Sequence, residues 1–78
     1  MRADHVKSRA DLVIFVRELA DEATHADWEN DRLDLFLEAM SGWIGDMDGW
    51  YRNRNEAIPE QPSWTVIAQM LSAATVYE

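Results

Sequence analysis

Hydrophobic residues recur at three- and four-residue steps in three parts of the chain, the spacing that predicts amphipathic helices. The clearest run begins at Leu33 and continues for more than two heptads as one apolar stripe. Asn30 is a favourable N-cap before this run, with Asp31 and Asp34 in the first turns, so we expect a helix over residues 31–52. The members of the stripe are Leu33, Phe36, Leu37, Met40, Trp43, Ile44, Met47, Trp50 and Tyr51.

Three glycines interrupt the stripe of this expected helix. Gly42, Gly45 and Gly49 each lower the stability of a helix by roughly 1 kcal/mol relative to alanine. We therefore expect the second half of the helix to bend or to end early.

An earlier helix is expected over residues 9–23. Ser8 is a candidate N-cap, and Asp11 follows three residues later in the position of a capping box. The apolar run at residues 13–16 also fits a strand, but it leads directly into good helix formers without alternation, which favours a helix. Residues 1–7 are largely polar, and we expect them to be frayed.

A third helix is expected over residues 64–77, with Ser63 as its N-cap. No charged residue occurs in this segment, and apolar residues occupy most of the helical circumference, which is typical of a helix sandwiched between others or paired. Residues 53–62 carry two prolines and predict an ordered loop. The chain is therefore expected to be a single all-α domain, a compact three-helix bundle with a structured, proline-containing loop before the last helix.

The composition limits how such a small fold can be stabilised. A chain of 78 residues needs a rich core, and 47% apolar residues with four tryptophans can supply one. There is no cysteine, so disulfides, thiolate metal sites and thiol nucleophiles are excluded. The N-terminal residues lack the apolar run of a secretory signal, and no stretch reaches the ~18 apolar residues of a membrane span. We therefore expect a cytoplasmic protein that makes no contact with membranes.

Negative charge is concentrated in one block of the chain. Fifteen acids and seven bases give a net charge of −8, which argues against binding to a nucleic-acid backbone. Residues 18–48 hold ten acids and one base, a charge of −9, and the remaining residues hold five acids and six bases. If the first two helices are antiparallel neighbours, this block forms a negative surface that steers a basic partner. A solvated face that only keeps the protein soluble is the alternative.

One aliphatic residue, Leu35, falls on the charged face of the expected second helix. The glycines of that helix lie roughly on the same side, where a second chain could approach the backbone closely. Single exposed aliphatic residues are also common without any function. The candidate partner surface consists of Asp27, Glu29, Asp31, Asp34, Leu35 and Glu38.

Residues with metal-binding or catalytic potential are few. Residues 46–49 have the sequence that begins a calcium loop, but the oxygen ligands that should follow are absent, and residue 57 is alanine where glutamate is required. His25 could combine with Asp46 and Asp48 as a calcium, magnesium, zinc or acid–base site. No serine is placed as an obvious nucleophile, and surface histidines are usually solvated. We expect no catalytic residue, no metal ligand and no cofactor.

Several short strings of residues, spread over most of the chain, are more specific than periodicity. They are Trp28-Glu29-Asn30, Phe36-Leu37-Glu38-Ala39-Met40, Trp43, Asp46-Met47-Asp48-Gly49-Trp50-Tyr51, Asn53, Pro62-Ser63-Trp64 and Tyr77-Glu78. In these strings the chain resembles a family of short uncharacterised bacterial proteins known only as a domain of unknown function. The resemblance implies a bacterial origin and a stand-alone domain of about this length. It implies no activity and assigns no functional residue.

The sequence thus predicts a small acidic domain that is not an enzyme. We expect it to bind a protein partner or to associate with itself, for example as a homodimer, and not to bind nucleic acid. Two alternatives remain open at this point. One is a small metal-binding protein, and the other is an acidic mimic of nucleic acid that inhibits a nucleic-acid-binding protein.

Overall fold

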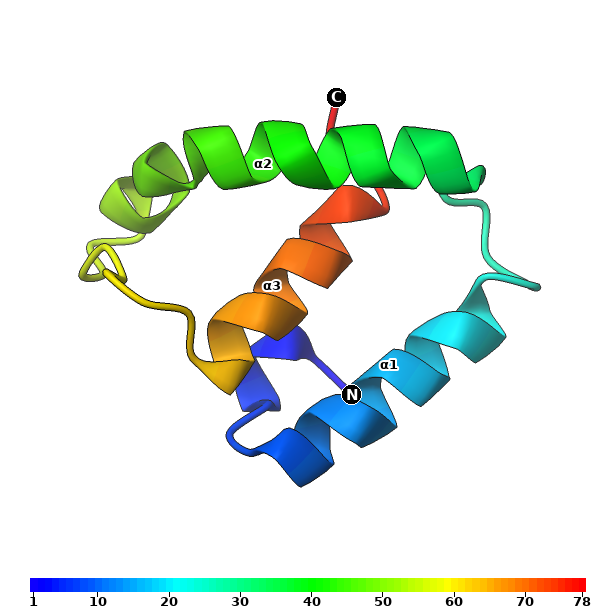
Figure 1. Ribbon diagram of the computed structural model, residues 1–78, viewed down its shortest axis with the longest axis horizontal. Coiled ribbons are helices and arrows are strands. Elements are labelled where there is room, and N and C mark those ends of the chain that lie inside the picture. Colours follow the sequence, from blue (N-terminus) through cyan, green and yellow to red (C-terminus); the bar gives the residue numbers. More distant parts are fainter.

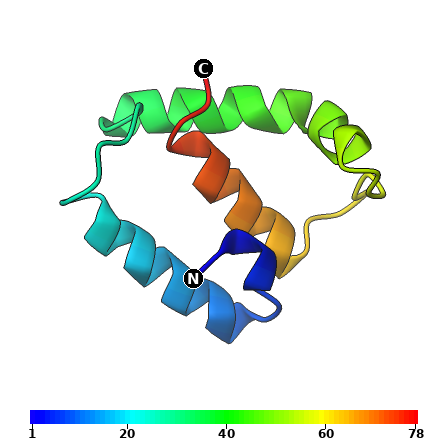
Figure 2. The same ribbon diagram turned by 180° about the vertical axis from the view of Figure 1, so that it is seen from behind.

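Three α-helices and one short 3-10 helix make up the computed structural model, which describes residues 1–78. Their order is η1 (Ala3–His5), α1 (Arg9–Glu22), α2 (Leu33–Asn53) and α3 (Trp64–Ala74). There is no strand, so the expected all-α three-helix bundle is confirmed, and residues 13–16 lie within α1. α3 occupies the centre, with α2 crossing on one side and η1 and α1 on the other (Figures 1 and 2).

Local hydrogen bonds that the sequence predicts fix the start of α1. The Ser8 hydroxyl accepts a bond from the Asp11 N–H at 3.1 Å, which confirms Ser8 as the N-cap. The Asp11 carboxylate in turn accepts the Lys7 N–H at 2.9 Å, so two backbone donors at the helix start are satisfied.

The start of α2 was predicted wrongly. The helix begins at Leu33 and its N-cap is Arg32, whose side chain makes no capping bond. Asn30 does not cap α2, because its amide donates to the carbonyls of Ala74 and Tyr77, at 2.9 Å each. An asparagine that favours an N-cap locally is used here to hold a distant segment.

α2 does not end early at its glycines, but its last turns bend, which is the other outcome that the glycines predict. The helix continues past all three glycines to Asn53, and Figure 1 shows its last turns, in yellow-green, turning away from the line of the rest. Trp43, between Gly42 and Gly45, and Tyr51, after Gly49, are buried in one cluster with Val66 of α3. Their packing outweighs the low helix propensity of glycine. Asn55 then adopts a left-handed conformation (φ 57°), and the Glu56 N–H bonds to the Tyr51 carbonyl to end the helix.

The last helix is shorter than predicted. α3 ends at Ala74, whereas helical periodicity predicts it to Tyr77. The serine N-cap is confirmed, since the Ser63 hydroxyl accepts the Val66 N–H at 3.1 Å. At the other end, the backbone N–H of Asn30 donates to the Thr75 carbonyl at 3.0 Å and the Asn30 amide donates to the Ala74 carbonyl, so the helix-terminal carbonyls are satisfied from outside.

The N-terminal residues are not frayed. Val6 is fully buried and packs with Phe15 of α1 and Ala68 of α3. The Thr65 hydroxyl donates to the Val6 carbonyl, which fixes the backbone at this point. One buried valine contributes about 1.5 kcal/mol or more, enough to order a short segment that looks polar in sequence.

The core consists of two clusters, and α3 contributes to both. Val6, Phe15 and Ala68 form the first, and Trp43, Tyr51 and Val66 form the second. α3 lacks charge because it packs on both sides. None of the helices has the length and apolarity needed to cross a membrane.

Candidate functional site

An apolar hollow of about 350 Å³ opens between α1 and the beginning of α2. We call it the apolar hollow. Its main wall residues are Val16 and Ala20 of α1, Ala23 directly after α1, Leu33 and Phe36 of α2, and Leu71 of α3. Trp28, in the connection between the two helices, stacks on Phe36 with ring centres 5.9 Å apart and completes the wall. The hollow exists because α3 holds α1 and α2 apart, so their facing apolar sides do not meet.

A row of apolar side chains extends the hollow along α2. Leu33, Leu37, Met40 and Ile44 follow one another at four-, three- and four-residue steps, so they share one side of the helix. We call them the apolar row. Leu33 is 74% exposed, Leu37 51% and Ile44 42%, and Val16 across the hollow is 43% exposed. Three of the nine residues of the stripe that predicted α2 are therefore exposed rather than used by the core.

The total exposed surface is large for a chain of this size. The solvent-accessible area is 5511 Å², whereas a compact monomer of this mass exposes about 4,850 Å². The excess of roughly 650 Å² is close to the ~800 Å² that each partner buries in a standard protein interface. An open arrangement of helices with exposed apolar side chains is typical of a surface that another chain covers.

The acids of the predicted partner surface lie around this region. Asp27, Glu29, Asp31, Asp34 and Glu38 are all exposed, in the connection before α2 and in its first two turns. Asp34 pairs with Arg32 at 2.8 Å. The negative surface is not formed by two antiparallel neighbouring helices as the sequence suggested, because α3 lies between α1 and α2.

Leu35, the aliphatic member of the predicted partner surface, is half-buried. It lies two positions from Leu33 and therefore on a different side of α2 from the apolar row. Of the three glycines on the Leu35 side of α2, Gly42 is not accessible to a second chain, because a Cβ at this position would lie 3.3 Å from the Tyr77 ring of the same chain. Gly45 and Gly49 have open space around the position of a Cβ.

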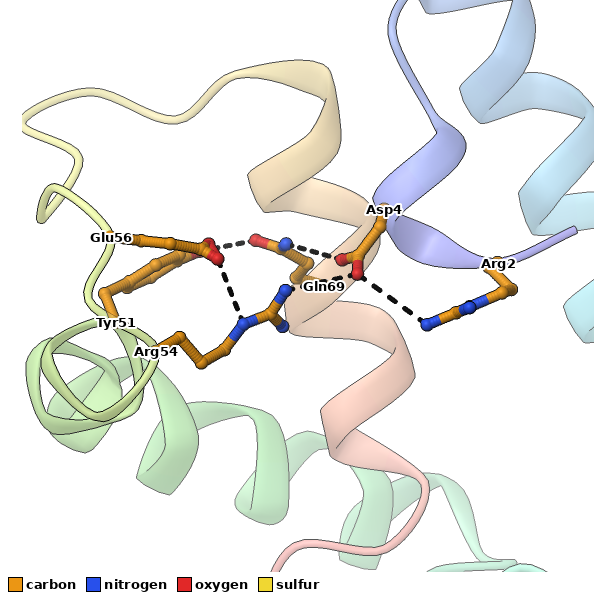
Figure 3. Close-up of polar contacts among 6 residues, drawn as sticks. All are labelled: Arg2, Asp4, Tyr51, Arg54, Glu56 and Gln69. Atoms are coloured by element: carbon orange, nitrogen blue, oxygen red, sulfur yellow. Dashed lines mark hydrogen bonds and ion pairs between the residues drawn. The ribbon is translucent and has the colours of Figure 1, made fainter.

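A polar cluster on the opposite face of α3 connects three parts of the chain (Figure 3). The Tyr51 hydroxyl donates to the Gln69 side-chain oxygen at 2.6 Å, and the Gln69 amide donates to Asp4 at 2.9 Å. Arg54 pairs with Asp4 at 3.3 Å and with Glu56 at 3.0 Å, while its guanidinium lies 4.2 Å from the Trp50 ring centre. The cluster thereby ties the N-terminal segment to α3 and to the end of α2.

The protonation states of this cluster follow from its bonds. The hydrogen bond from Gln69, reinforced by Arg54, holds the pKa of the Asp4 carboxyl below its ordinary value, although partial burial opposes this. Burial raises the pKa of the Tyr51 phenol, and the nearby Glu56 carboxylate adds to the shift. A charged carboxylate and a neutral phenol are the forms that these hydrogen bonds require, so the cluster holds segments together at neutral pH.

Beside this cluster lies a second hollow, of about 400 Å³, with mixed lining. Trp43 and Trp50 form its apolar side, and Asp4 and Gln69 belong to its polar side. The N-terminal ammonium group pairs with Glu18 at its edge. Its main polar groups are already paired, Asp4 with Gln69 and Glu18 with the N-terminal ammonium, whereas the walls of the apolar hollow are largely aliphatic and aromatic.

The residues considered for a metal or acid–base site do not form one cluster, and two of them have other partners. His25 lies 3.8 Å from Asp21, and Asp46 accepts a hydrogen bond from the Tyr77 hydroxyl, which raises the pKa of that phenol. Asp48 is exposed. Across residues 1–78 no group of three or more histidine, aspartate or glutamate side chains could hold a metal ion.

Sequence reasoning missed the polar cluster and the apolar hollow. Gln69 is the one long polar side chain in a helix without charged residues, and buried polar groups are normally hydrogen-bonded, so it is a signal for a specific partner. No comparable signal identified Asp4, 65 residues away along the chain. The hollow depends on how far apart α1 and α2 lie, which no local pattern encodes.

Comparison with known proteins yields one match. No curated protein and no solved structure matches the chain. A protein-family model described as "Family of unknown function (DUF7660)" matches residues 8–78. The match covers all three α-helices and the connection that carries Trp28 and Asn30. The resemblance to a domain of unknown function is thus confirmed, and the chain belongs to this family of unknown function.

Proposed function

We propose that this chain is a non-enzymatic protein-interaction domain that binds another polypeptide through the apolar hollow and the apolar row. The observation that carries the proposal is the set of exposed aliphatic side chains beside the hollow, with Leu33 at 74% and Leu37 at 51% exposed. Aliphatic side chains that line a concave surface gain free energy when a partner removes them from water, at roughly 25 cal/mol per Å². The excess exposed area supports the same conclusion.

The proposal includes a cytoplasmic location. A cysteine-free chain folds without disulfides and needs no oxidising compartment. The polar cluster around Asp4 and Gln69 has a structural role in this proposal, because each of its members already bonds to another part of the fold.

The test compares what the immobilised protein retains from a lysate of the native cell with what two variants retain. The double variant Leu33→Asn, Leu37→Asn alters the apolar row, and Ile14→Asn is the control. Ile14 is 48% exposed on α1, two positions before Val16 and so on a different side of that helix. Circular dichroism establishes that the variants fold.

We expect the wild type and Ile14→Asn to retain the same proteins and the double variant to lose them. Light scattering of the purified wild type covers the case in which the partner is a second copy, since a dimer that the double variant abolishes supports the same surface. The proposal is refuted if the double variant retains the same proteins as the wild type. It is equally refuted if nothing is retained and the wild type is monomeric.

A further inference from the structure

We infer that the partner held by the apolar hollow and the apolar row is an amphipathic helix with basic flanks, contributed by a different protein. This inference rests on the proposed function and specifies its partner.

The shape of the surface fits a helix. The apolar row spans twelve residues of α2, from Leu33 to Ile44, which is about 16 Å or three turns. Its four-, three- and four-residue steps are those at which two helices interdigitate their side chains. At the Leu33 end the row opens into the hollow of about 350 Å³, which provides room for a large apolar side chain of the partner.

The charges around the surface select a basic partner. Asp27, Glu29 and Asp31 are exposed in the connection that borders the hollow, and none of them takes part in an ion pair. Arg32 is the one base between residues 18 and 48, and Asp34 already pairs with it. Lysine or arginine on the flanks of a docked helix would compensate these carboxylates and speed the encounter.

The same charges argue against a second copy of this chain. A two-fold dimer through this surface would place two blocks of charge −9 next to each other, each made of ten acids and one base. Like charges across an interface are unfavourable and suppress association. A partner of opposite charge removes this penalty, so the occupant is a different protein.

The experiment uses two synthetic helical peptides of about 18 residues as probes. Both carry leucine at positions i, i+3, i+4 and i+7, and the remaining positions are lysine in one peptide and glutamate in the other. Binding to the full chain is measured by fluorescence anisotropy of the labelled peptide, at low and at high salt. Tryptophan emission is recorded in parallel, because Trp28 borders the hollow.

We expect the leucine–lysine peptide to bind and the leucine–glutamate peptide not to bind. Affinity should fall at least tenfold in the variant Leu37→Asn and stay unchanged in Ile14→Asn. In the triple variant Asp27→Asn, Glu29→Gln, Asp31→Asn, affinity should fall several-fold and depend less on salt. These three acids are exposed and unpaired, so their neutral counterparts leave the fold intact.

The inference is overturned if neither peptide binds, if the acidic peptide binds as well as the basic one, or if Leu37→Asn binds the basic peptide as tightly as the wild type. Failure of the peptides together with row-dependent capture of proteins from the lysate, or with a row-dependent dimer, leaves the proposed function standing and assigns a different partner. If the peptides do not bind and the lysate and light-scattering experiments also fail, both the inference and the proposed function are refuted.

Discussion

Asn30 holds the connection between α1 and α2 to the C-terminal end of the chain. Its side-chain amide donates two hydrogen bonds, to the carbonyls of Ala74 and Tyr77, both at 2.9 Å and in a half-buried setting. Replacing Asn30 with alanine removes both bonds and leaves two carbonyls without these partners. At about 1 kcal/mol for each bond, we expect the free energy of unfolding to fall by about 2 kcal/mol.

The variant Asn30→Asp keeps the shape of the side chain and exchanges the donor for a carboxylate oxygen. The carboxylate then faces two carbonyl oxygens, so this variant should be less stable than Asn30→Ala at pH 7. Below about pH 4 the introduced carboxyl becomes protonated and regains one donor, so the difference between the two variants should shrink. This pH dependence separates lost hydrogen bonds from lost packing.

Urea denaturation followed by tryptophan fluorescence measures these changes. With a denaturant slope of about 1 kcal/mol per molar, a loss of ~2 kcal/mol lowers the midpoint by about 2 M. The control is Asn53→Ala, because Asn53 is exposed at the end of α2. If Asn30→Asp and Asn30→Ala shift the midpoint no more than the control does, Asn30 is not the link that the structure indicates.

Three further predictions concern the N-terminal segment and α2. Val6→Ala should lower the free energy of unfolding by about 2 kcal/mol, measured in urea, because Val6 is fully buried; no effect would mean that the segment is frayed. The hydrogen bond from Gln69 lowers the pKa of Asp4, so the charged carboxylate stabilises the fold above its unfolded pKa of about 4. Asp4→Asn should therefore lower the free energy of unfolding by less than ~1 kcal/mol at neutral pH, and this difference should vanish in acid. Gly45→Ala should raise the free energy of unfolding by up to about 1 kcal/mol, seen as a higher melting temperature. Gly42→Ala should raise it less, because its Cβ would meet the Tyr77 ring; the reverse order would contradict this packing.

The order and type of the elements could be read from local patterns. Ser8 and Ser63 cap the helices that follow them, as local chemistry predicts, since a serine hydroxyl needs only a backbone N–H three residues on. The apolar stripe of α2 was visible for the same reason, because its period is a property of one helix. The stripe did not reveal which of its residues the core buries and which stay exposed.

Residues with long-range partners could not be assigned in this way. Asn30 has the chemistry of an N-cap but bonds to residues more than forty positions away, and Val6 is buried by side chains from α1 and α3. Each outcome depends on which segments meet in space, and local propensity is too weak to decide this. The same holds for Asp4 and Gln69 in the polar cluster.

The sequence by itself determined the all-α class, the approximate helices, the family and the concentration of acids between residues 18 and 48, because these are properties of composition and of short-range spacing. Only the tertiary structure decided that α3 separates α1 from α2. That separation leaves Leu33 and Val16 exposed at a hollow and Leu37 exposed beside it, and it places acids such as Asp31 at the border of the hollow. Whether an apolar side chain is buried depends on the position of its neighbours, and this position emerges only when the helices pack together.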